Sequence, residues 1–368
     1  MPWFPEKGEL NLLRAIPGLK SEAERLSRRR FEPLASAPKV QGRLGEWSRM
    51  VRRKLGGGEE LSYEANDWLM RTMAKECGRK GVTAVHSYED CSLWQFQEAK
   101  RRGKACIYDM PIGYYGWWQK KEAELAKKYR DWLPPEGISS SQWVRPEQKK
   151  KEMELADVIL APSSFVADTI HGLFDKRVVL APYGADPISV LPDSKPTRDH
   201  PFRLLFVGTA SVRKGAPLLL EVWKKLGWKD AELVMAGAWQ LANMVQKQLP
   251  SGVRYLGQLP KENLKRLYQT SDFLVHPSNF EGFSLSILEA LAEGLPVLAS
   301  AATGAGDLPG SPAIRLFEPE DPEQLVEVLI RAKTDRGKDL SQEARRAAEG
   351  CAWKAYREKV RETVAPFV

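Results

Sequence analysis

The stretch NFEGFSLSILEALAEGLPVLAS, residues Asn279–Ser300, decides the fold of the second half of the chain. Its centre, Ser284–Glu293, has the apolar spacing of a largely buried helix, and Pro296–Ala299 follows as a short apolar strand. The residues that open the helix, Gly282–Leu285, would present backbone N–H groups at a helix N-terminus, which favours a bound diphosphate. The stretch therefore predicts a helix and strand of an α/β domain with an anion site at the start of the helix.

Two glutamates of this stretch, Glu281 and Glu289, stand eight positions apart. A glycosidase pair would face one bond with its carboxyl groups about 5–9.5 Å apart. Five helical residues from Ser284 to Glu289 rise about 7.5 Å, and the loop before the helix adds to this distance. The two carboxylates therefore suit opposite parts of one extended ligand. The alternative for Glu289, a solvent-facing helix position, is weakened by the apolar residues that surround it.

Outward from this stretch, short strands alternate with amphipathic helices from residue 82 onward, a pattern typical of doubly wound parallel sheets. The expected strands of the first half are Val82–His86, Ala105–Tyr108, Asp157–Ala161 and Arg177–Ala181. Those of the second half are Phe202–Val207, Glu232–Ala236, Arg254–Leu256, Phe273–His276 and Pro296–Ala299. The expected helices are Leu93–Arg102, Phe165–Leu173, Leu218–Leu226, Leu241–Leu249, Lys261–Thr270, Ser284–Glu293, Pro322–Lys333, Ser341–Glu349 and Trp353–Val364.

The length of 368 residues suits two domains of about 150–200 residues each. A Pro- and Asp-rich segment from Pro182 to Pro201 is the best candidate for a linker. We expect two doubly wound, Rossmann-like α/β domains that face a cleft: an acceptor-side domain over residues 1–185 and a nucleotide-sugar-binding domain over 186–350. A C-terminal helix within 351–368 could cross back to the first domain. Residues 1–80 hold no convincing strand, so the first domain is expected to be incomplete.

A second signal is the loop GTASVRKG, Gly208–Gly215, between a strand and a helix. It lacks the G-x4-G-K-[ST] spacing of a P-loop. Gly208 permits close approach of the backbone to a ligand, and Arg213 with Lys214 places two cations at the end of a strand, which is the ligand side of an open α/β sheet. Two cations could neutralise a diphosphate leaving group without a metal ion. A basic turn without a ligand is the alternative.

These residues together resemble the family-four group of retaining, nucleotide-sugar-dependent glycosyltransferases with the GT-B fold. The resemblance covers roughly residues 80–368. Its matching pieces are ADVILAPSSFV (Ala156–Val166), APYGAD (Ala181–Asp186), VGTASVRKG (Val207–Gly215), the E-x7-E run that starts at Glu281, and EALAEGLPVLAS (Glu289–Ser300). It implies transfer of a hexose from a nucleotide diphosphate sugar to a glycan, lipid or small-molecule acceptor, with no cofactor and no metal.

The resemblance also implies roles for single residues. Arg213 and Lys214 would bind the donor diphosphate, Glu281 would contact hydroxyls of the transferred sugar, and Glu289 would contact the ribose. The remaining donor-binding residues expected are Gly208, Thr209, Gly282, Phe283, Ser284, Leu285, Leu256 and Gln258, with the base near Leu256–Leu259. The retaining reaction is explained by front-face attack, which needs electrostatic stabilisation of the leaving group more than a protein nucleophile.

The acceptor side is expected in the first domain. His86 and Asp109 follow or end strands there and could contact acceptor or sugar. The aromatic residues of the next segment could stack on a sugar ring or a lipid: Tyr114, Tyr115, Trp117 and Trp118. A buried, hydrogen-bonded histidine and an interdomain packing cluster are the alternatives.

The chain departs from the family pattern at its start. The usual opening strand, glycine loop, helix and second strand have no counterpart in the sequence, and we expect Met1 to fall after that unit. Thr209 replaces the arginine that usually stands beside the first glycine, with Arg213 as its substitute. These departures motivate a second hypothesis, a catalytically inactive nucleotide-sugar-binding protein or scaffold.

Composition bears on partners and location. The net charge of +8 is carried almost entirely by residues 1–185, which could contact an anionic membrane as a peripheral protein. Solvated basic helix faces are the alternative, and no RRM, KH or helix-turn-helix pattern supports nucleic-acid binding. Four cysteines without a C-x-x-C pair and no long apolar run fit a reduced, cytoplasmic protein. The oligomeric state is left open.

Overall fold

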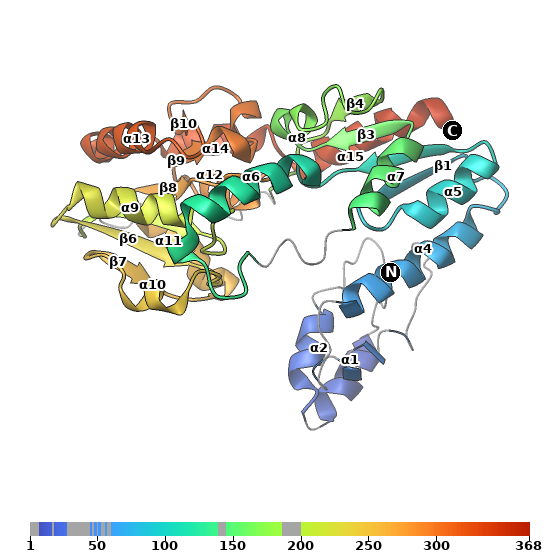
Figure 1. The fold of residues 1–368 in the computed structure, drawn as a ribbon, viewed down its shortest axis with the longest axis horizontal. Coiled ribbons are helices and arrows are strands. Elements are labelled where there is room, and N and C mark those ends of the chain that lie inside the picture. Colours follow the sequence, from blue (N-terminus) through green and yellow to red (C-terminus); the bar gives the residue numbers. More distant parts are fainter. Residues whose placement is uncertain are drawn as a thin grey trace. The chain divides into compact units, whose positions relative to one another are not determined.

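The computed structural model describes residues 7–16, 18–27, 60–138, 145–185 and 200–368, with isolated positions between 45 and 56 (Figure 1). It divides into two compact units. The first holds residues up to Cys106 together with Glu147–Leu155, and the second holds Ile107–Pro146 and Ala156–Val368. Each unit is described by itself below.

The first unit is mostly helical in its described part. Its elements are α1 (Lys7–Ala15), α2 (Lys20–Ser27), α4 (Glu60–Glu76), β1 (Ala84–Tyr88), α5 (Leu93–Arg101) and most of α7 (Pro146–Leu155). The buried Glu152 of α7 joins this helix to the turn between β1 and α5, because its carboxylate accepts from the backbone amides of Asp90 at 2.9 Å, Ser92 at 3.0 Å and Leu93 at 3.1 Å. One carboxylate thus satisfies the N–H groups that open α5.

The second unit begins with part of a parallel sheet. Strand β2 (Ala105–Asp109) pairs through Ile107–Asp109 with β3 (Val158–Ala161), which pairs with β4 (Arg177–Leu180). Helix α6 (Tyr115–Lys128) and the short α8 (Ser164–Asp168) accompany these strands. The C-terminal α15 (Trp353–Val364) contacts the same sheet, since Tyr356 donates a hydrogen bond to the carboxylate of Asp109 at the end of β2.

The larger sheet has six parallel strands in the order β10-β9-β8-β5-β6-β7. These are β5 (Phe202–Val207), β6 (Ala231–Ala236), β7 (Val253–Tyr255), β8 (Phe273–His276), β9 (Val297–Ser300) and β10 (Ile314–Phe317). The connecting helices are α9 (Ala216–Leu226), α10 (Asn243–Lys247), α11 (Lys261–Thr270), α12 (Leu285–Ala292), α13 (Pro322–Thr334) and α14 (Ser341–Glu349). Numbered within the sheet, this is the Rossmann order 3-2-1-4-5-6, which reverses between β5 and β8.

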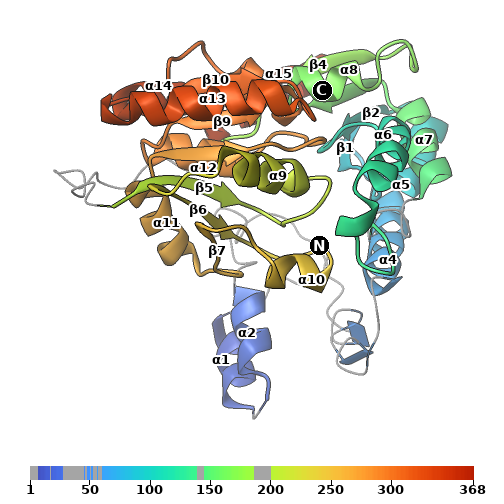
Figure 2. The ribbon, with the colours of Figure 1, turned by 60° about the vertical axis from the view of Figure 1, so that its left-hand side comes forward.

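Side chains of β5 alternate between two cores, as the period of a strand requires. Phe202, Leu204 and Phe206 belong to the core that also contains residues of α9 and α13. Leu205 and Val207 belong to the opposite core, with residues of α12 and α14. Helices therefore cover both faces of this sheet, as Figures 1 and 2 show, and both faces of its central strands are apolar.

The sequence missed several elements and misjudged one. Helices α1, α4, α6 and α7 and the edge strand β10 were not expected, and the helix expected at Phe165–Leu173 ends at Asp168. The linker residues 186–199 and the basic cluster at 28–30 lie outside the described residues. The predicted division at residues 185 and 350 stays a prediction. The boundaries of the two compact units fall at other positions in the chain.

Candidate functional site

The site lies where the strand order of the larger sheet reverses. The loops that follow β5 and β8 leave adjacent strands at their carboxyl ends, and they carry the GTASVRKG and Glu281 motifs. In open α/β sheets this crevice is the usual place for a ligand. Topology alone therefore brings the two sequence motifs together.

Close backbone packing fixes the basic loop. Gly215 has a left-handed backbone with φ +68°, and a Cβ there would lie 1.9 Å from the carbonyl oxygen of Pro277. Two hydrogen bonds to the carbonyl oxygen of Arg213, from the Asn279 amide at 2.8 Å and Ser278 Oγ at 3.1 Å, join the two loops again. The basic loop and the Glu281 loop therefore form one packed body.

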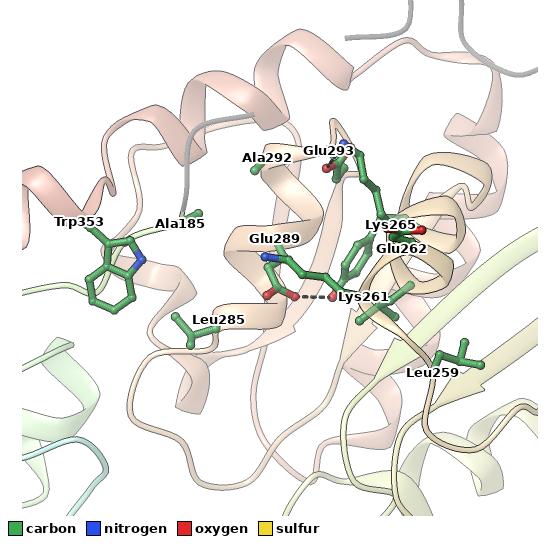
Figure 3. A pocket seen from close by; sticks show the side chains of 13 residues that line it. Ala185, Leu259, Lys261, Glu262, Lys265, Leu285, Glu289, Ala292, Glu293 and Trp353 are labelled. Carbon is green, nitrogen blue, oxygen red and sulfur yellow. Dashed lines mark hydrogen bonds and ion pairs between the residues drawn. The ribbon is translucent and has the colours of Figure 1, made fainter. Parts of the chain in front are cut away.

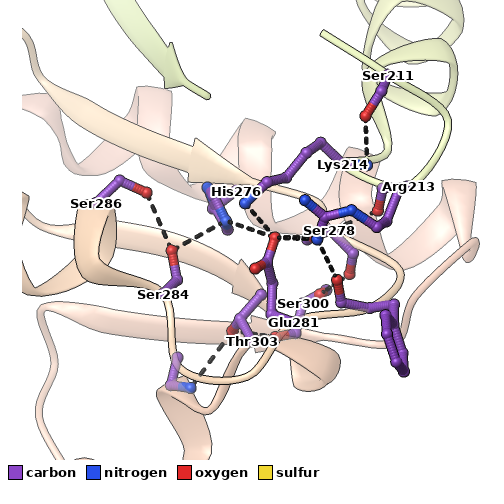
Figure 4. Close-up of polar contacts among 12 residues, drawn as sticks. Ser211, Arg213, Lys214, His276, Ser278, Glu281, Ser284, Ser286, Ser300 and Thr303 are labelled. Atoms are coloured by element: carbon purple, nitrogen blue, oxygen red, sulfur yellow. Dashed lines mark hydrogen bonds and ion pairs between the residues drawn. The ribbon is translucent and has the colours of Figure 1, made fainter. Parts of the chain in front are cut away.

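Two cations and one carboxylate form the centre of the site (Figure 4). Lys214 Nζ forms an ion pair with Glu281 Oε1, and Arg213 Nη1 lies 3.1 Å from the same oxygen. Ser278 Oγ lies 2.9 Å from the same oxygen, so its single hydroxyl proton is shared between Glu281 and the carbonyl oxygen of Arg213. Burial alone would raise the pKa of Glu281, but Lys214 and Arg213 outweigh burial and lower this pKa to about 2. Glu281 is therefore ionised at neutral pH.

The buried His276, at the end of β8, lies beside this carboxylate. Its Nε2 is 3.1 Å from Ser284 Oγ and 4.0 Å from Glu281 Oε1. Burial, and then the charge of Lys214, lower the pKa of His276 to about 3. His276 is therefore a neutral imidazole at physiological pH, and the site keeps two cations rather than three.

We expect the neutral His276 to make stability depend on pH. The unfolded chain binds a proton below pH 6.5 and the folded one only near pH 3, so the free energy of unfolding falls as the pH falls through this window. From pH 7 to pH 5 the contribution is about 2 kcal/mol. Urea unfolding at the two pH values should show a loss smaller by this amount in His276→Gln. Equal losses in both proteins would contradict the assignment.

The backbone at the start of α12 agrees only in part with the expected anion site. The amides of Gly282, Phe283 and Leu285 donate to no acceptor within the described part of the chain. The amide of Ser284 donates to the carbonyl oxygen of Thr303 at 3.1 Å, because the loop is anchored on the turn that follows β9. Ser284 therefore enters the site through its hydroxyl group, and its predicted role as an amide donor is corrected.

Glu289 is an exposed residue of α12, which agrees with the solvent-facing alternative, and it lines a pocket of about 870 Å³ (Figure 3). Tyr268 of α11 donates to its carboxylate at 3.1 Å. Leu259, Lys261, Leu285 and Trp353 are among the other lining residues, whereas Glu281 and Lys214 are not. The pocket and the cation cluster adjoin at the start of α12, since Ser284 contacts His276 and the next residue, Leu285, lines the pocket.

Other predicted donor-side residues lie near these groups without forming part of them. Gly208 follows β5, and the aliphatic chain of Lys214 lies over it, with Cε 3.8 Å from the position of a Cβ. Thr209 is half-buried on the same loop. Leu256 packs on the core, Gln258 is exposed, and neither lines the pocket, although the neighbouring Leu259 does. Their predicted roles stay predictions.

The structure corrects the acceptor-side prediction for Asp109. Its carboxylate is buried and accepts hydrogen bonds from Tyr183, at 3.3 Å, and from Tyr356. Burial between two phenols gives this carboxylate a structural role, in place of acceptor contact. His86 is an exposed residue of β1 in the first unit, and its predicted role is untested.

The aromatic segment after β2 packs on the Glu281 loop. Trp117 and Trp118 stack on Phe280 with ring centroids 5.7 Å and 5.1 Å away, and Phe165 meets the same ring edge-on at 6.1 Å. The contacts favour the packing alternative for these tryptophans. These contacts also restrict the position of Glu281, because Phe280 directly precedes it in the chain.

Sequence reasoning missed His276, Ser278 and Tyr268. A signal existed for the first two, because the segment HPS stands where a strand ends, at the ligand edge of the sheet. Tyr268 lies within a helix, and only the packing of α11 on α12 reveals its contact with Glu289. No group of three metal-ligating side chains and no helix long and apolar enough to cross a membrane occurs in the part of the chain that the structure describes.

Two parallel α/β sheets, with a cation pair at the switch point of the larger one, define a Rossmann-like protein of the GT-B class. Solved structures confirm the fold. The apo lipopolysaccharide outer core galactosyltransferase WaaB aligns with a TM-score of 0.61 at 16% identity over 84% of this chain and 82% of its own. HepE of Anabaena in complex with UDP-glucose aligns with a TM-score of 0.58 at 14% identity over 82% of each chain.

Sequence comparison finds a matching protein family and similar curated proteins. The family described as "Glycosyl transferases group 1" matches residues 189–350. The O-antigen chain mannosyltransferase B of Escherichia coli is 30% identical over 147 residues, which are 36% of either protein. The match thus spans about a third of that curated relative. The predicted resemblance to glycosyltransferases is confirmed.

Proposed function

We propose that this protein is a retaining glycosyltransferase that moves a hexose from a nucleotide diphosphate sugar to a hydroxyl group of a glycan, lipid or small-molecule acceptor. The observation that carries the proposal is the convergence of Lys214, Arg213 and Glu281 at the switch point of a Rossmann sheet. Support comes from the family of residues 189–350 and from the sugar-transferring relatives.

The cations would bind and neutralise the diphosphate. Negative charge grows on the diphosphate as the bond to the sugar breaks, and fixed cations in a site of low water content stabilise this charge effectively. Lys214 is mostly buried, with 14% of its side chain exposed, and Arg213 is 28% exposed. Their positions are preorganised by the loop contacts, so little reorganisation is needed during the reaction.

Glu281 would orient the transferred sugar. An ionised carboxylate accepts hydrogen bonds from sugar hydroxyls, and the pKa of about 2 keeps it ionised. We assign no nucleophile: the acceptor hydroxyl would attack the anomeric carbon on the face from which the diphosphate leaves, and the leaving diphosphate would take the hydroxyl proton. This path retains the anomeric configuration.

The pocket beside α12 would hold the nucleoside. Glu289 would accept from the ribose hydroxyls, and Leu259 and Leu285 offer apolar surface to the base. Pockets that bind nucleosides typically combine such apolar walls with a few polar groups.

A panel of nucleotide sugars tests the proposal: UDP-glucose, UDP-galactose, UDP-N-acetylglucosamine and GDP-mannose, each with the purified full chain. We expect one of them to be hydrolysed or transferred with release of the nucleoside diphosphate. Binding of UDP or GDP without turnover of any donor would instead favour the inactive nucleotide-sugar-binding protein.

We expect Glu289→Ala to raise the donor KM about tenfold with a smaller change in kcat. A contact to the ribose is made in the ground state and the transition state alike, so its loss weakens binding uniformly. Tenfold corresponds to about 1.4 kcal/mol, which is typical of a hydrogen bond to a charged group. Initial rates over a range of donor concentrations measure the effect, with the exposed Glu323→Ala as control. A loss confined to kcat would contradict the ribose assignment.

A further inference from the structure

Glu320, in the turn between β10 and α13, has an unusual backbone. Its φ is +65°, and Asp90 is the only other non-glycine residue with positive φ among those that the structure describes. A side chain with a Cβ is disfavoured in this left-handed region, where glycine is at ease. Such strain persists only where the surrounding structure holds the residue in place.

The side chain of Glu320 has three donors around it. Oε2 accepts from Lys128 Nζ at 2.8 Å and from the Tyr129 hydroxyl at 2.7 Å, both at the end of α6. Oε1 accepts from Asn279 Nδ2 at 2.8 Å. Only 9% of the side chain is exposed, so these bonds are largely shielded from water and ordered.

Asn279 carries the connection onward to the cation loop. Its side-chain amide donates both to Glu320 and, at 3.0 Å, to the carbonyl oxygen of Val212. Its backbone amide donates to the carbonyl oxygen of Arg213. Asn279 is fully buried and lies two residues before Glu281. A single side chain therefore spans the basic loop, the Glu281 loop and Glu320.

We propose that Glu320 is a positioning residue: through Asn279 it holds the Arg213–Lys214 loop and Glu281 in register for the diphosphate, and it ties both to the end of α6. The proposal deepens the proposed function and rests on it for the identity of the ligand. Glu320 touches no reacting atom in this role. It acts through the orientation of the Asn279 amide.

The test compares Glu320→Gly and Glu320→Gln with Glu318→Gln, an exposed glutamate of the same turn. Glycine relieves the left-handed backbone but removes all three bonds, whereas glutamine keeps the size and one acceptor oxygen. Hydrogen exchange by mass spectrometry should rise about tenfold in the segments 211–215 and 277–281 in Glu320→Gly, by less in Glu320→Gln, and not at all in Glu318→Gln. The affinity for UDP or GDP, measured by calorimetry, should fall about tenfold in Glu320→Gly.

A merely structural role would give a different pattern. It would lower the thermal midpoint and raise exchange in α6 and α13, with wild-type exchange in the two loop segments and wild-type nucleotide affinity, and this result would overturn the proposal. If Glu320→Gly does not fold, Glu320→Gln decides by the same readouts. If the wild-type chain binds neither UDP nor GDP, the proposed function fails, while the exchange comparison still decides whether Glu320 positions the loops.

Discussion

Replacing Lys214 by alanine is expected to lower the rate of sugar transfer by about two to three orders of magnitude, the usual cost of removing one preorganised donor from a site of developing negative charge. Lys214 Nζ lies at the centre of the site beside Glu281, on a loop fixed by Gly215 and Ser211. Because the charge of the diphosphate grows in the transition state, the effect should fall mainly on kcat.

A second effect of this substitution must be separated from the first. Removal of Lys214 also leaves the buried Glu281 with less compensation, and the pKa of this carboxyl would rise since Lys214 is the main group that lowers it. The double variant Lys214→Ala/Glu281→Gln removes the unpaired charge as well. If Lys214 acts on the diphosphate, the double variant remains as slow as Lys214→Ala or slower.

Initial rates with a saturating donor measure the effect, and Lys224→Ala serves as control because Lys224 is an exposed lysine of α9. Recovery of activity in the double variant would show that Lys214 only neutralises Glu281. A wild-type rate in Lys214→Ala would remove this lysine from the proposed mechanism altogether.

The larger sheet and the helices around it were largely predictable from local sequence. Five expected elements have the observed bounds, Phe202–Val207, Lys261–Thr270, Phe273–His276, Ser341–Glu349 and Trp353–Val364, and most others differ by one or two residues. Buried strands and amphipathic helices each have a strong period, so the pattern decides the element. Strand β10 was missed because Ile314–Phe317 is a half-exposed edge strand with an arginine in it.

The first part of the chain was less predictable. Helix α6 opens with Tyr115, Gly116 and two tryptophans, and none of these residues is a good helix former. Its position is set by packing of Trp117 and Trp118 on Phe280, which is 162 residues away from Trp118 in sequence. Tertiary contacts of this kind override local propensity and leave no local signal.

The residues of the site also fall into two groups: some could be predicted from the sequence and others could not. Arg213, Lys214 and Glu281 could be predicted because each lies in a loop that follows a strand, on the side of the sheet where ligand-binding groups gather. Glu320 could not be predicted, since nothing in FEPEDPEQ shows that this residue turns back to meet Asn279. Asp109 was misassigned because the sequence cannot show that Tyr183 and Tyr356 enclose its carboxylate.

Gly282→Ala is expected to disrupt the site severely, although the substitution adds only one methyl group. A Cβ at Gly282 would lie 1.7 Å from the carbonyl oxygen of Pro111 and 3.2 Å from the Cα of Ile112. Both are backbone atoms that no rotamer change can move, so the loop of Glu281 must shift. We expect a loss of about 2–4 kcal/mol in the free energy of unfolding and a loss of transfer activity of about a hundredfold, since a shift of about 1 Å at a reacting centre costs this much.

Gly306→Ala is the matched control for this substitution. A Cβ there would meet only Leu316 Cδ1, at 3.6 Å, which is an ordinary contact with a side chain. Urea unfolding and transfer rates should therefore be close to those of the wild type in Gly306→Ala and strongly reduced in Gly282→Ala. If the two variants behave alike, the Pro111 segment does not approach the Glu281 loop as closely as the structure shows. That result would also contradict the packing of Trp117 and Trp118 on Phe280.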